Sequence, residues 1–142
     1  MIQSENDLRA LVREECGDKA RWVEPGLGSS YGLPDCWVAH KGHCVHLELK
    51  LGRIIQIGKL STLAFDLRPG QRQEIKAMMR DEIKVGLLVG LAHSNLIWFL
   101  RPVKEVIAGR VNSQILINQS NEWEPGSTGD KSFESGINIF YF

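Results

Sequence analysis

Two segments of the chain carry apolar residues at helical spacing, and each has its own start and stop signals. In the first, Ser4 followed by Asp7 has the spacing of an N-cap arrangement, and Gly17 provides a carboxy-terminal stop. The apolar positions between these signals are Leu8, Leu11 and Val12. This pattern predicts a helix over residues 5–16.

The second helical segment follows Pro69, a residue that suits the first turn of a helix. Its apolar stripe stops near Gly86 and consists of Ile75, Met78, Met79 and Ile83. We therefore expect a second helix over residues 71–84.

Runs of β-favouring residues predict the strands. Residues 36–40 and 44–50 are separated by Lys41 and Gly42, which is typical of a β-hairpin. Residues 51–67 are rich in apolar side chains but show no clean period, so they remain unassigned. The other expected strands cover residues 20–23, 85–91 and 95–100.

The resulting order is α-β-β-β-α-β-β, which predicts an α/β fold of the α+β type with a mixed sheet. A chain of 142 residues with 43% hydrophobic residues fits a single domain, residues 1–142. Within it we expect a core over about residues 4–100 and a β-rich carboxy-terminal extension over about 101–142.

The charge balance limits the classes of partner. Lys plus Arg and Asp plus Glu both total 17, so the net charge is zero and any basic surface must be local. No apolar run approaches the ~20 residues of a membrane span, and the first residues lack the features of a secretory signal. Three scattered cysteines are typical of reduced thiols. We expect a cytoplasmic protein, or one of the host cytoplasm if viral, with no membrane partner.

Three charged residues of the hairpin form the candidate active site. Glu48 and Lys50 end an otherwise apolar strand and point to the same face, because side chains alternate along a strand. Asp35, after Pro34, begins the antiparallel partner strand, so the hairpin brings all three together. Taken singly, they would be explained by a surface ion pair and a turn-capping acid.

Two carboxylates beside an ammonium indicate phosphodiester chemistry. Such hard oxygen ligands suit Mg²⁺, for which Mn²⁺ would substitute. Metal-bound water attacks phosphorus, and Lys50 is suited to orient that nucleophile or to stabilise developing charge.

The chain resembles the PD-(D/E)xK nuclease superfamily, most closely the VRR-NUC type and the archaeal Holliday-junction resolvases. The resemblance rests on Gly32-Leu33-Pro34-Asp35, Glu48-Leu49-Lys50 and the stretch Leu67-Arg-Pro-Gly-Gln71 before a helix. It implies a restriction-endonuclease-like αβββαβ core and Mg²⁺-dependent hydrolysis of DNA in repair or recombination. It also implies that metal is held by Asp35, Glu48 and the carbonyl of Leu49, that Lys50 is catalytic, and that the protein is a homodimer.

The family usually adds a glutamate from the first helix. Glu5 is the first choice, because it lies at the edge of the apolar face and its distance before Asp35 resembles that in the junction resolvases. Glu14, Glu15 and Glu24 remain alternatives.

A row of basic residues on the second helix is the candidate DNA contact. Arg72, Lys76, Arg80 and Lys84 recur every four residues, although Glu74, Asp81 and Glu82 dilute their charge and a solvated helix face would explain them equally well. Ser29, Ser30 and Tyr31 of the glycine-rich loop, and Gln71 near the site, complete the expected DNA-binding set. Gln71 is equally well explained as an ordinary polar residue of the first helical turn.

Other sites are less well supported. Cys36, His40, His43, Cys44 and His46 match no zinc-binding pattern. Gly26-x-Gly28 is not followed by a helix, so no nucleotide cofactor is expected. Two functions therefore remain: a structure-selective endonuclease acting on branched or flapped DNA, with restriction-type or exonucleolytic cleavage as variants, and a non-catalytic DNA-binding module. For a homodimer, residues 54–65 or 137–142 would supply apolar surface.

Overall fold

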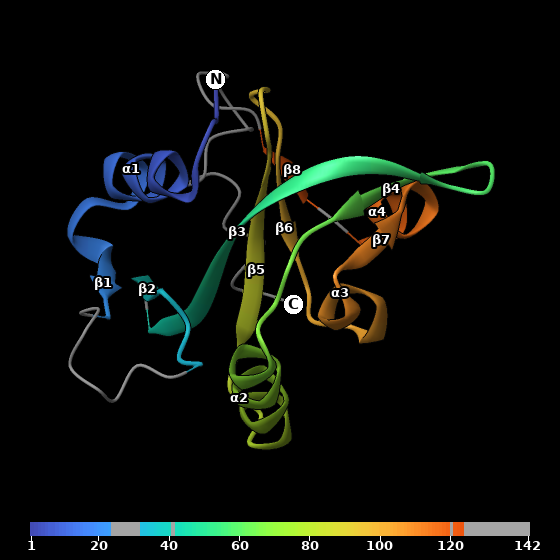
Figure 1. Ribbon diagram of the computed structural model, residues 1–142. Helices are drawn as coiled ribbons and strands as arrows, with labels where there is room; N and C mark the ends of the chain where they lie inside the picture. Colours follow the sequence, from blue (N-terminus) through green and yellow to red (C-terminus); the bar gives the residue numbers. More distant parts are fainter. Residues whose placement is uncertain (24–31, 41, 120, 124–142) are drawn as a thin grey trace.

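The computed structural model describes residues 1–23, 32–40, 42–119 and 121–123 of the chain (Figure 1). Its helices are α1 (Glu5–Cys16), the 3-10 helix η1 (Gly17–Lys19), α2 (Pro69–Arg80), α3 (Lys104–Ala108) and α4 (Ser113–Gln119). Its strands are β1 (Ala20–Trp22), β2 (Cys36–His40), β3 (His43–Ile57), β4 (Leu60–Ala64), β5 (Val85–Leu91), β6 (Ile97–Leu100), β7 (Arg110–Asn112) and β8 (Asn121–Trp123). None of the described helices combines the length and the apolar composition needed to cross a bilayer.

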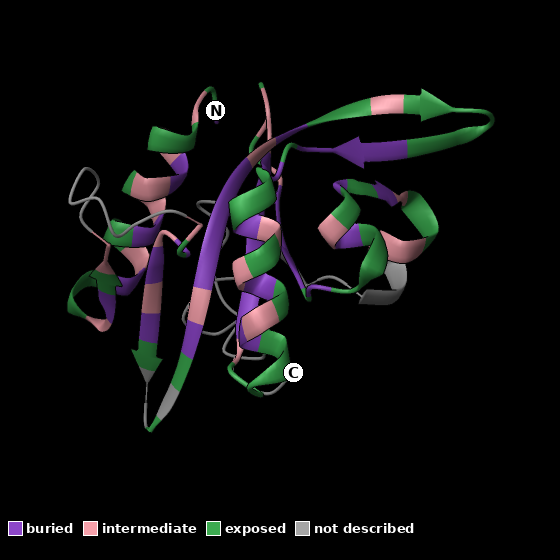
Figure 2. Ribbon diagram, turned by 60° about the horizontal axis from the view of Figure 1, so that its bottom comes forward, coloured by how far each residue is buried: buried purple, intermediate pink, exposed green. Residues whose placement is uncertain are grey.

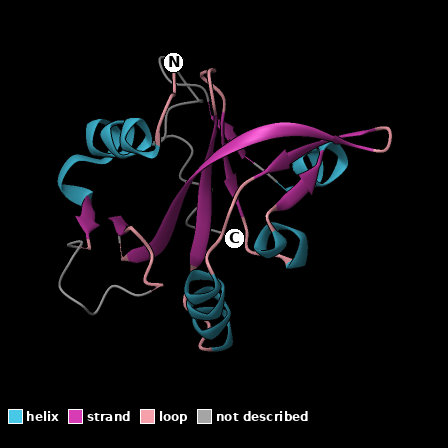
Figure 3. Cartoon of the chain, in the orientation of Figure 1, coloured by secondary structure: helices cyan, strands magenta, loops and turns pink. Residues whose placement is uncertain are grey.

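The sheet is mixed, with β3 at its centre (Figure 3). The strand order is β1-β2-β3-β5-β6-β8, and β4 and β7 extend from the second half of β3. Neighbouring strands are antiparallel except β3 and β5, which run parallel because α2 lies in the crossover between them. The mixed α+β class expected from the sequence is therefore confirmed.

Helix α1 begins and ends where its sequence predicts. The Ser4 hydroxyl accepts the Asp7 N–H at 3.3 Å, while the Asp7 carboxylate accepts the Ser4 N–H at 3.1 Å, which completes a capping box. Leu8 and Val12 are fully buried, as the apolar stripe requires. The caps and the stripe thus fix both the limits and the rotation of this helix.

The two faces of the sheet pack against different helices. Leu47 and Leu49 of β3 join Leu8 and Val12 of α1 in one core cluster. Val85, Leu87 and Val89 of β5 join Ile75 and Met78 of α2 in the other. Strand β3 passes between these clusters and is buried through much of its length (Figure 2).

The unassigned segment forms an arm. Strand β3 continues past Lys50 to Ile57 and pairs with β4, so that residues 53–61 extend away from the body, whereas Leu63 and Ala64 of β4 are buried (Figure 1). The exposed fractions of Ile54, Ile57 and Leu60 are 46%, 52% and 47%. Because both faces of the outer arm lack a packed layer, the apolar residues there show no period of two.

Two expectations need correction. The second helix ends at Arg80 rather than residue 84, because Glu82 adopts a positive φ of 57° that ends the helical backbone; Lys84 is therefore not part of α2. The carboxy-terminal extension is not β-rich over residues 101–123, where it forms helices α3 and α4 beside two three-residue strands. Val106, Ile107, Ile115 and Leu116 pack from this region on the second core cluster. Residues 124–142, including the apolar 137–142, lie outside the described part.

A close contact between glycines joins the start of β2 to the start of α2. Gly32 has a φ of +83°, and a Cβ at this position would lie 2.3 Å from the carbonyl oxygen of Gly70. Asp35 lies three residues after Gly32, and Gln71 comes directly after Gly70. This contact therefore sets the distance between the segment that carries Asp35 and the segment that carries Gln71.

We expect Gly32→Ala to destabilise the protein more than Gly42→Ala. Gly42 has nearly the same φ, +82°, but a Cβ added there would meet no atom within 4 Å, so its replacement measures the left-handed backbone alone, about 1–2 kcal/mol. Gly32→Ala adds the clash with Gly70. Urea unfolding of both variants tests this, and equal losses of unfolding free energy would contradict the close contact.

Candidate active site

Strand β3 presents two charged side chains inside the fold. Glu48 is 2% exposed and Lys50 7% exposed, because β3 pairs there with β5 and Gln71 of α2 lies over the charged face. The alternating Leu47 and Leu49 point to the α1 side and are fully buried. The expected division of β3 into a charged and an apolar face is confirmed.

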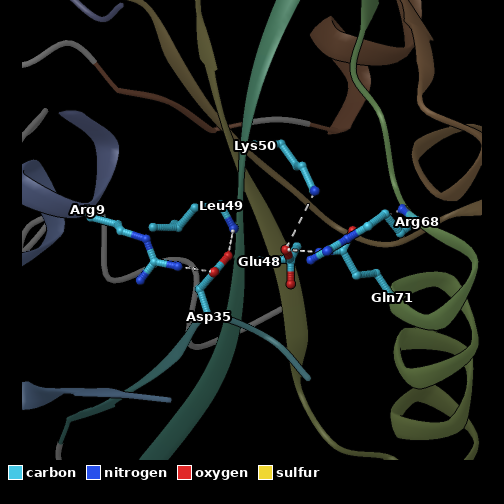
Figure 4. Close-up of polar contacts among 7 residues, drawn as sticks. All are labelled: Arg9, Asp35, Glu48, Leu49, Lys50, Arg68 and Gln71. Carbon is cyan, nitrogen blue, oxygen red and sulfur yellow. Dashed lines mark hydrogen bonds and ion pairs between the residues drawn. The ribbon is translucent and has the colours of Figure 1, made fainter. Parts of the chain in front are cut away.

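Asp35 lies beside Glu48 at the entrance to β2. Cys36 pairs with Leu47, so the next step along the ladder brings Asp35 opposite Glu48. One carboxylate oxygen of Asp35 accepts the backbone N–H of Leu49 at 2.8 Å, and the other forms an ion pair with the guanidinium of Arg9 (Figure 4). The carboxylate is thus held from both β3 and α1.

Glu48 has one bonded oxygen and one without a partner. Its Oε1 accepts a hydrogen bond from the Gln71 amide at 2.9 Å and lies 3.8 Å from the Lys50 ammonium. The Gln71 carbonyl in turn accepts the N–H of Arg68, at the start of α2, at 2.9 Å. Among the described residues, no group bonds to Oε2 of Glu48, although this oxygen is buried.

The surroundings of Glu48 disfavour its negative charge. Burial is the largest cause, and the neighbouring charge of Asp35 acts in the same direction, so that the pKa of Glu48 is raised to about 9. The Lys50 ammonium lowers the pKa but does not offset these two effects. A further cation at this point would favour ionised Glu48.

The residues present fit a divalent cation. An unpartnered, buried carboxylate oxygen beside a second carboxylate would accept a divalent cation in place of the missing contact. The described residues bring together no group of three or more His, Cys, Asp and Glu of the kind that encloses a metal. Mg²⁺ needs fewer protein ligands than such a group supplies, since it usually takes one or two carboxylates and keeps several waters.

The first-helix acids occupy different surroundings. Glu5 is exposed at the start of α1, and its charge raises the pKa of Glu48. Glu14 lines a different hollow, with Ile2 and Asp7. Within the described residues, Glu15 forms no hydrogen bond or ion pair with the residues of the site. Glu24 lies outside the described part.

The expected DNA-binding residues separate into three groups. Gln71 is 4% exposed and its amide is bonded inside the site, so it is held away from a DNA-accessible surface. Lys76 and Arg80 are exposed and line a groove between α2 and α3, whereas Arg72 is half-buried. Ser29, Ser30 and Tyr31 lie outside the described residues.

Sequence reasoning missed Arg9 and Trp22. Arg9 follows Glu5 by four residues, and this spacing places both on one face of α1. Arg9 bonds to Asp35, and the ring of Trp22 lies against the guanidinium. The i, i+4 relation to Glu5 was the signal available in the sequence.

Comparison of the chain with protein-family models gives no match, and comparison with curated proteins gives none either.

We expect replacement of Glu48 by Gln to change how stability depends on pH. An unfolded Glu48 titrates near 4.5 and the folded one near 9, so the folded state binds the extra proton between these values and stability falls as pH rises through them. Glu48→Gln removes this effect, which is at most about 1.4 kcal/mol per pH unit. Its stability relative to the wild type should therefore increase from pH 5 to pH 9 in buffer with chelator.

Chemical denaturation across this pH range gives the measurement. Asp66→Asn is a matched control, because the Asp66 side chain is 93% exposed. A difference between Glu48→Gln and wild type that stays constant with pH would rule out the raised pKa.

Proposed function

We propose that this chain is a Mg²⁺-dependent endonuclease that hydrolyses phosphodiester bonds in structured DNA, such as a Holliday junction, another branched DNA or a flap. The observation that carries the proposal is the meeting of Asp35, Glu48 and Lys50 around a buried carboxylate oxygen that lacks a partner among the described residues. Two carboxylates can hold Mg²⁺, and an ammonium beside them can support the attack of water on phosphorus.

The order of elements supports the same proposal. An α-helix, three antiparallel strands, a second helix and a strand parallel to β3 follow one another in α1, β1, β2, β3, α2 and β5. This agrees with the αβββαβ core implied by the resemblance to PD-(D/E)xK nucleases. The resemblance also suggests the Leu49 carbonyl as a ligand and Glu5 as an additional acid.

Each residue has a distinct role in the proposed reaction. Asp35 and Glu48 would hold Mg²⁺ or Mn²⁺, which supplies charge neutralisation of the phosphate and acidification of bound water. Lys50 would orient the attacking water and stabilise the negative charge that develops on the phosphoryl oxygens. Hydrolysis forms a bond from the water oxygen to phosphorus and breaks a bond from phosphorus to a sugar oxygen, which receives a proton. Gln71 fixes Glu48 and is a positioning residue.

A non-catalytic DNA-binding module is the second candidate, and one observation favours it. Both oxygens of Asp35 already have protein partners, Arg9 and the N–H of Leu49. A carboxylate held in this way serves as a structural link between α1 and β3. Such a protein would bind DNA with strong salt dependence and would not cleave it.

Purified protein should nick branched DNA with Mg²⁺ or Mn²⁺ and stop when a chelator is added. We expect Asp35→Asn and Lys50→Ala each to reduce the cleavage rate about 100-fold or more, since the first removes a charged metal ligand and the second removes the cation that stabilises the developing charge. Lys104→Ala is the matched control, because Lys104 is exposed at the start of α3, outside both the candidate site and the arm. A panel of four-way, flapped, linear and single-stranded DNA identifies the preferred structure.

The outcomes separate the two candidates. Cleavage retained by Asp35→Asn or Lys50→Ala would overturn the assignment of the site. Salt-dependent binding without metal-dependent cleavage on any substrate would favour the binding module.

The proposal includes a homodimer, for which the arm offers a surface. Ile55, Ile57 and Leu60 share one face of the β3–β4 hairpin, because Ile57 pairs with Leu60 and Ile55 lies two residues away. The outermost pair is about half exposed. Exposed apolar residues at the end of a projecting hairpin are typical of a contact with another subunit.

We expect the double substitution Ile57→Ser and Leu60→Ser to convert a dimer to a monomer in light scattering at assay concentration. Met79→Ser serves as control, because Met79 is 44% exposed on α2 but lies apart from the arm. A wild-type protein that is monomeric while still making paired cuts in a four-way junction would contradict the dimer.

A further inference from the structure

Two arginines of α1 stack on the same tryptophan. The guanidinium carbon of Arg13 lies 4.4 Å from the ring centre of Trp22, and that of Arg9 lies 5.4 Å from it. Arg9 and Arg13 are four residues apart on α1 and therefore share a face, about 6 Å apart along the helix axis. The half-buried ring of Trp22 on β1 gives both guanidiniums a flat support.

The charges of this cluster are unbalanced. Arg9 pairs with Asp35, whereas within the described ranges no carboxylate lies at ion-pair distance from Arg13. Two like charges on neighbouring helical positions repel each other, so the arrangement has a cost that an anion would relieve. Arg13 is also exposed to solvent.

The cluster continues directly from the candidate active site. Asp35 bonds to Arg9, and Arg9 shares the Trp22 ring with Arg13, so these contacts lead outward from the carboxylates along α1. The exposed cations Lys76 and Arg80 belong to the other helix, α2. A DNA strand that leaves Asp35 toward α1 would therefore meet Arg13 beyond Arg9.

We propose that Arg13, held on Trp22 beside Arg9, binds a backbone phosphate of DNA on the α1 side of the site. This inference rests on the proposed function and adds to it the direction in which the strand leaves the carboxylates. A guanidinium fits a phosphate because its planar N–H groups match two phosphate oxygens, and stacking on an aromatic ring fixes its orientation. Arg9 remains a positioning residue for Asp35.

The opposing explanation is purely structural: the stacked arginines attach α1 to β1. Both explanations predict that Arg13 affects stability, so a stability measurement alone does not distinguish them. The dependence of DNA binding on salt does, because it counts the phosphates that the protein neutralises.

Anisotropy of a labelled four-way DNA junction, titrated with protein in chelator at several NaCl concentrations, provides the test. We expect Arg13→Gln to weaken binding several-fold at low salt and to reduce the slope of log K against log salt by about 1. Arg21→Gln is the matched control, since Arg21 is exposed on the same strand as Trp22 but alternates to the opposite side. It should leave the slope unchanged.

Thermal melting verifies that both variants are folded at the assay temperature. The inference is overturned if Arg13→Gln binds with the wild-type slope, if Arg21→Gln loses as much as Arg13→Gln, or if the wild type does not bind DNA. It is supported if only Arg13→Gln lowers the slope. Binding in chelator is measured independently of cleavage. If Arg13→Gln lowers the slope but the wild type shows no Mg²⁺-dependent cleavage, the phosphate contact of Arg13 is supported and the nuclease activity is rejected. If the wild type cleaves but Arg13→Gln leaves the slope unchanged, only the phosphate contact of Arg13 is rejected.

Discussion

The burial of Glu48 is the constraint on which the rest of the site depends. A carboxylate in the middle of a sheet loses its water, and isolated charges are not buried at low cost. The amide of Gln71 on α2 and the ammonium of Lys50 on β3 both lie near one oxygen of Glu48. The other oxygen has no partner among the described residues. Burial of this kind is unfavourable for stability, and buried acids with shifted pKa values cluster at functional sites.

The parts of the structure that could be predicted from the sequence are those set by local rules. Capping residues and a regular apolar stripe define α1, and strict alternation divides β3 between its charged and apolar faces. Antiparallel pairing then brings Asp35 to Glu48 from the hairpin length alone. These features depend on neighbours in sequence or on a single turn.

Other features depend on contacts that the sequence does not encode locally. The length of β3 was missed because its second half leaves the core, where burial no longer imposes a period. The end of α2 was misplaced because Ile83 continues the apolar stripe while the backbone turns at Glu82. The ion pair between Arg9 and Asp35 joins residues 26 apart, and only the packing of α1 against the sheet brings them together.

The glycine at position 52 divides β3 into two stretches of different local stability. Before it, β3 pairs with β2 over residues 43–47 and with β5 over residues 46–52, whereas residues 53–57 pair with β4 alone. A side chain at Gly52 would meet Leu63 and Val89, so the strands cross tightly at this point. Opening of backbone hydrogen bonds should therefore start at the arm and stop at Gly52. The arm can loosen and re-form while Glu48 and Lys50 keep their positions.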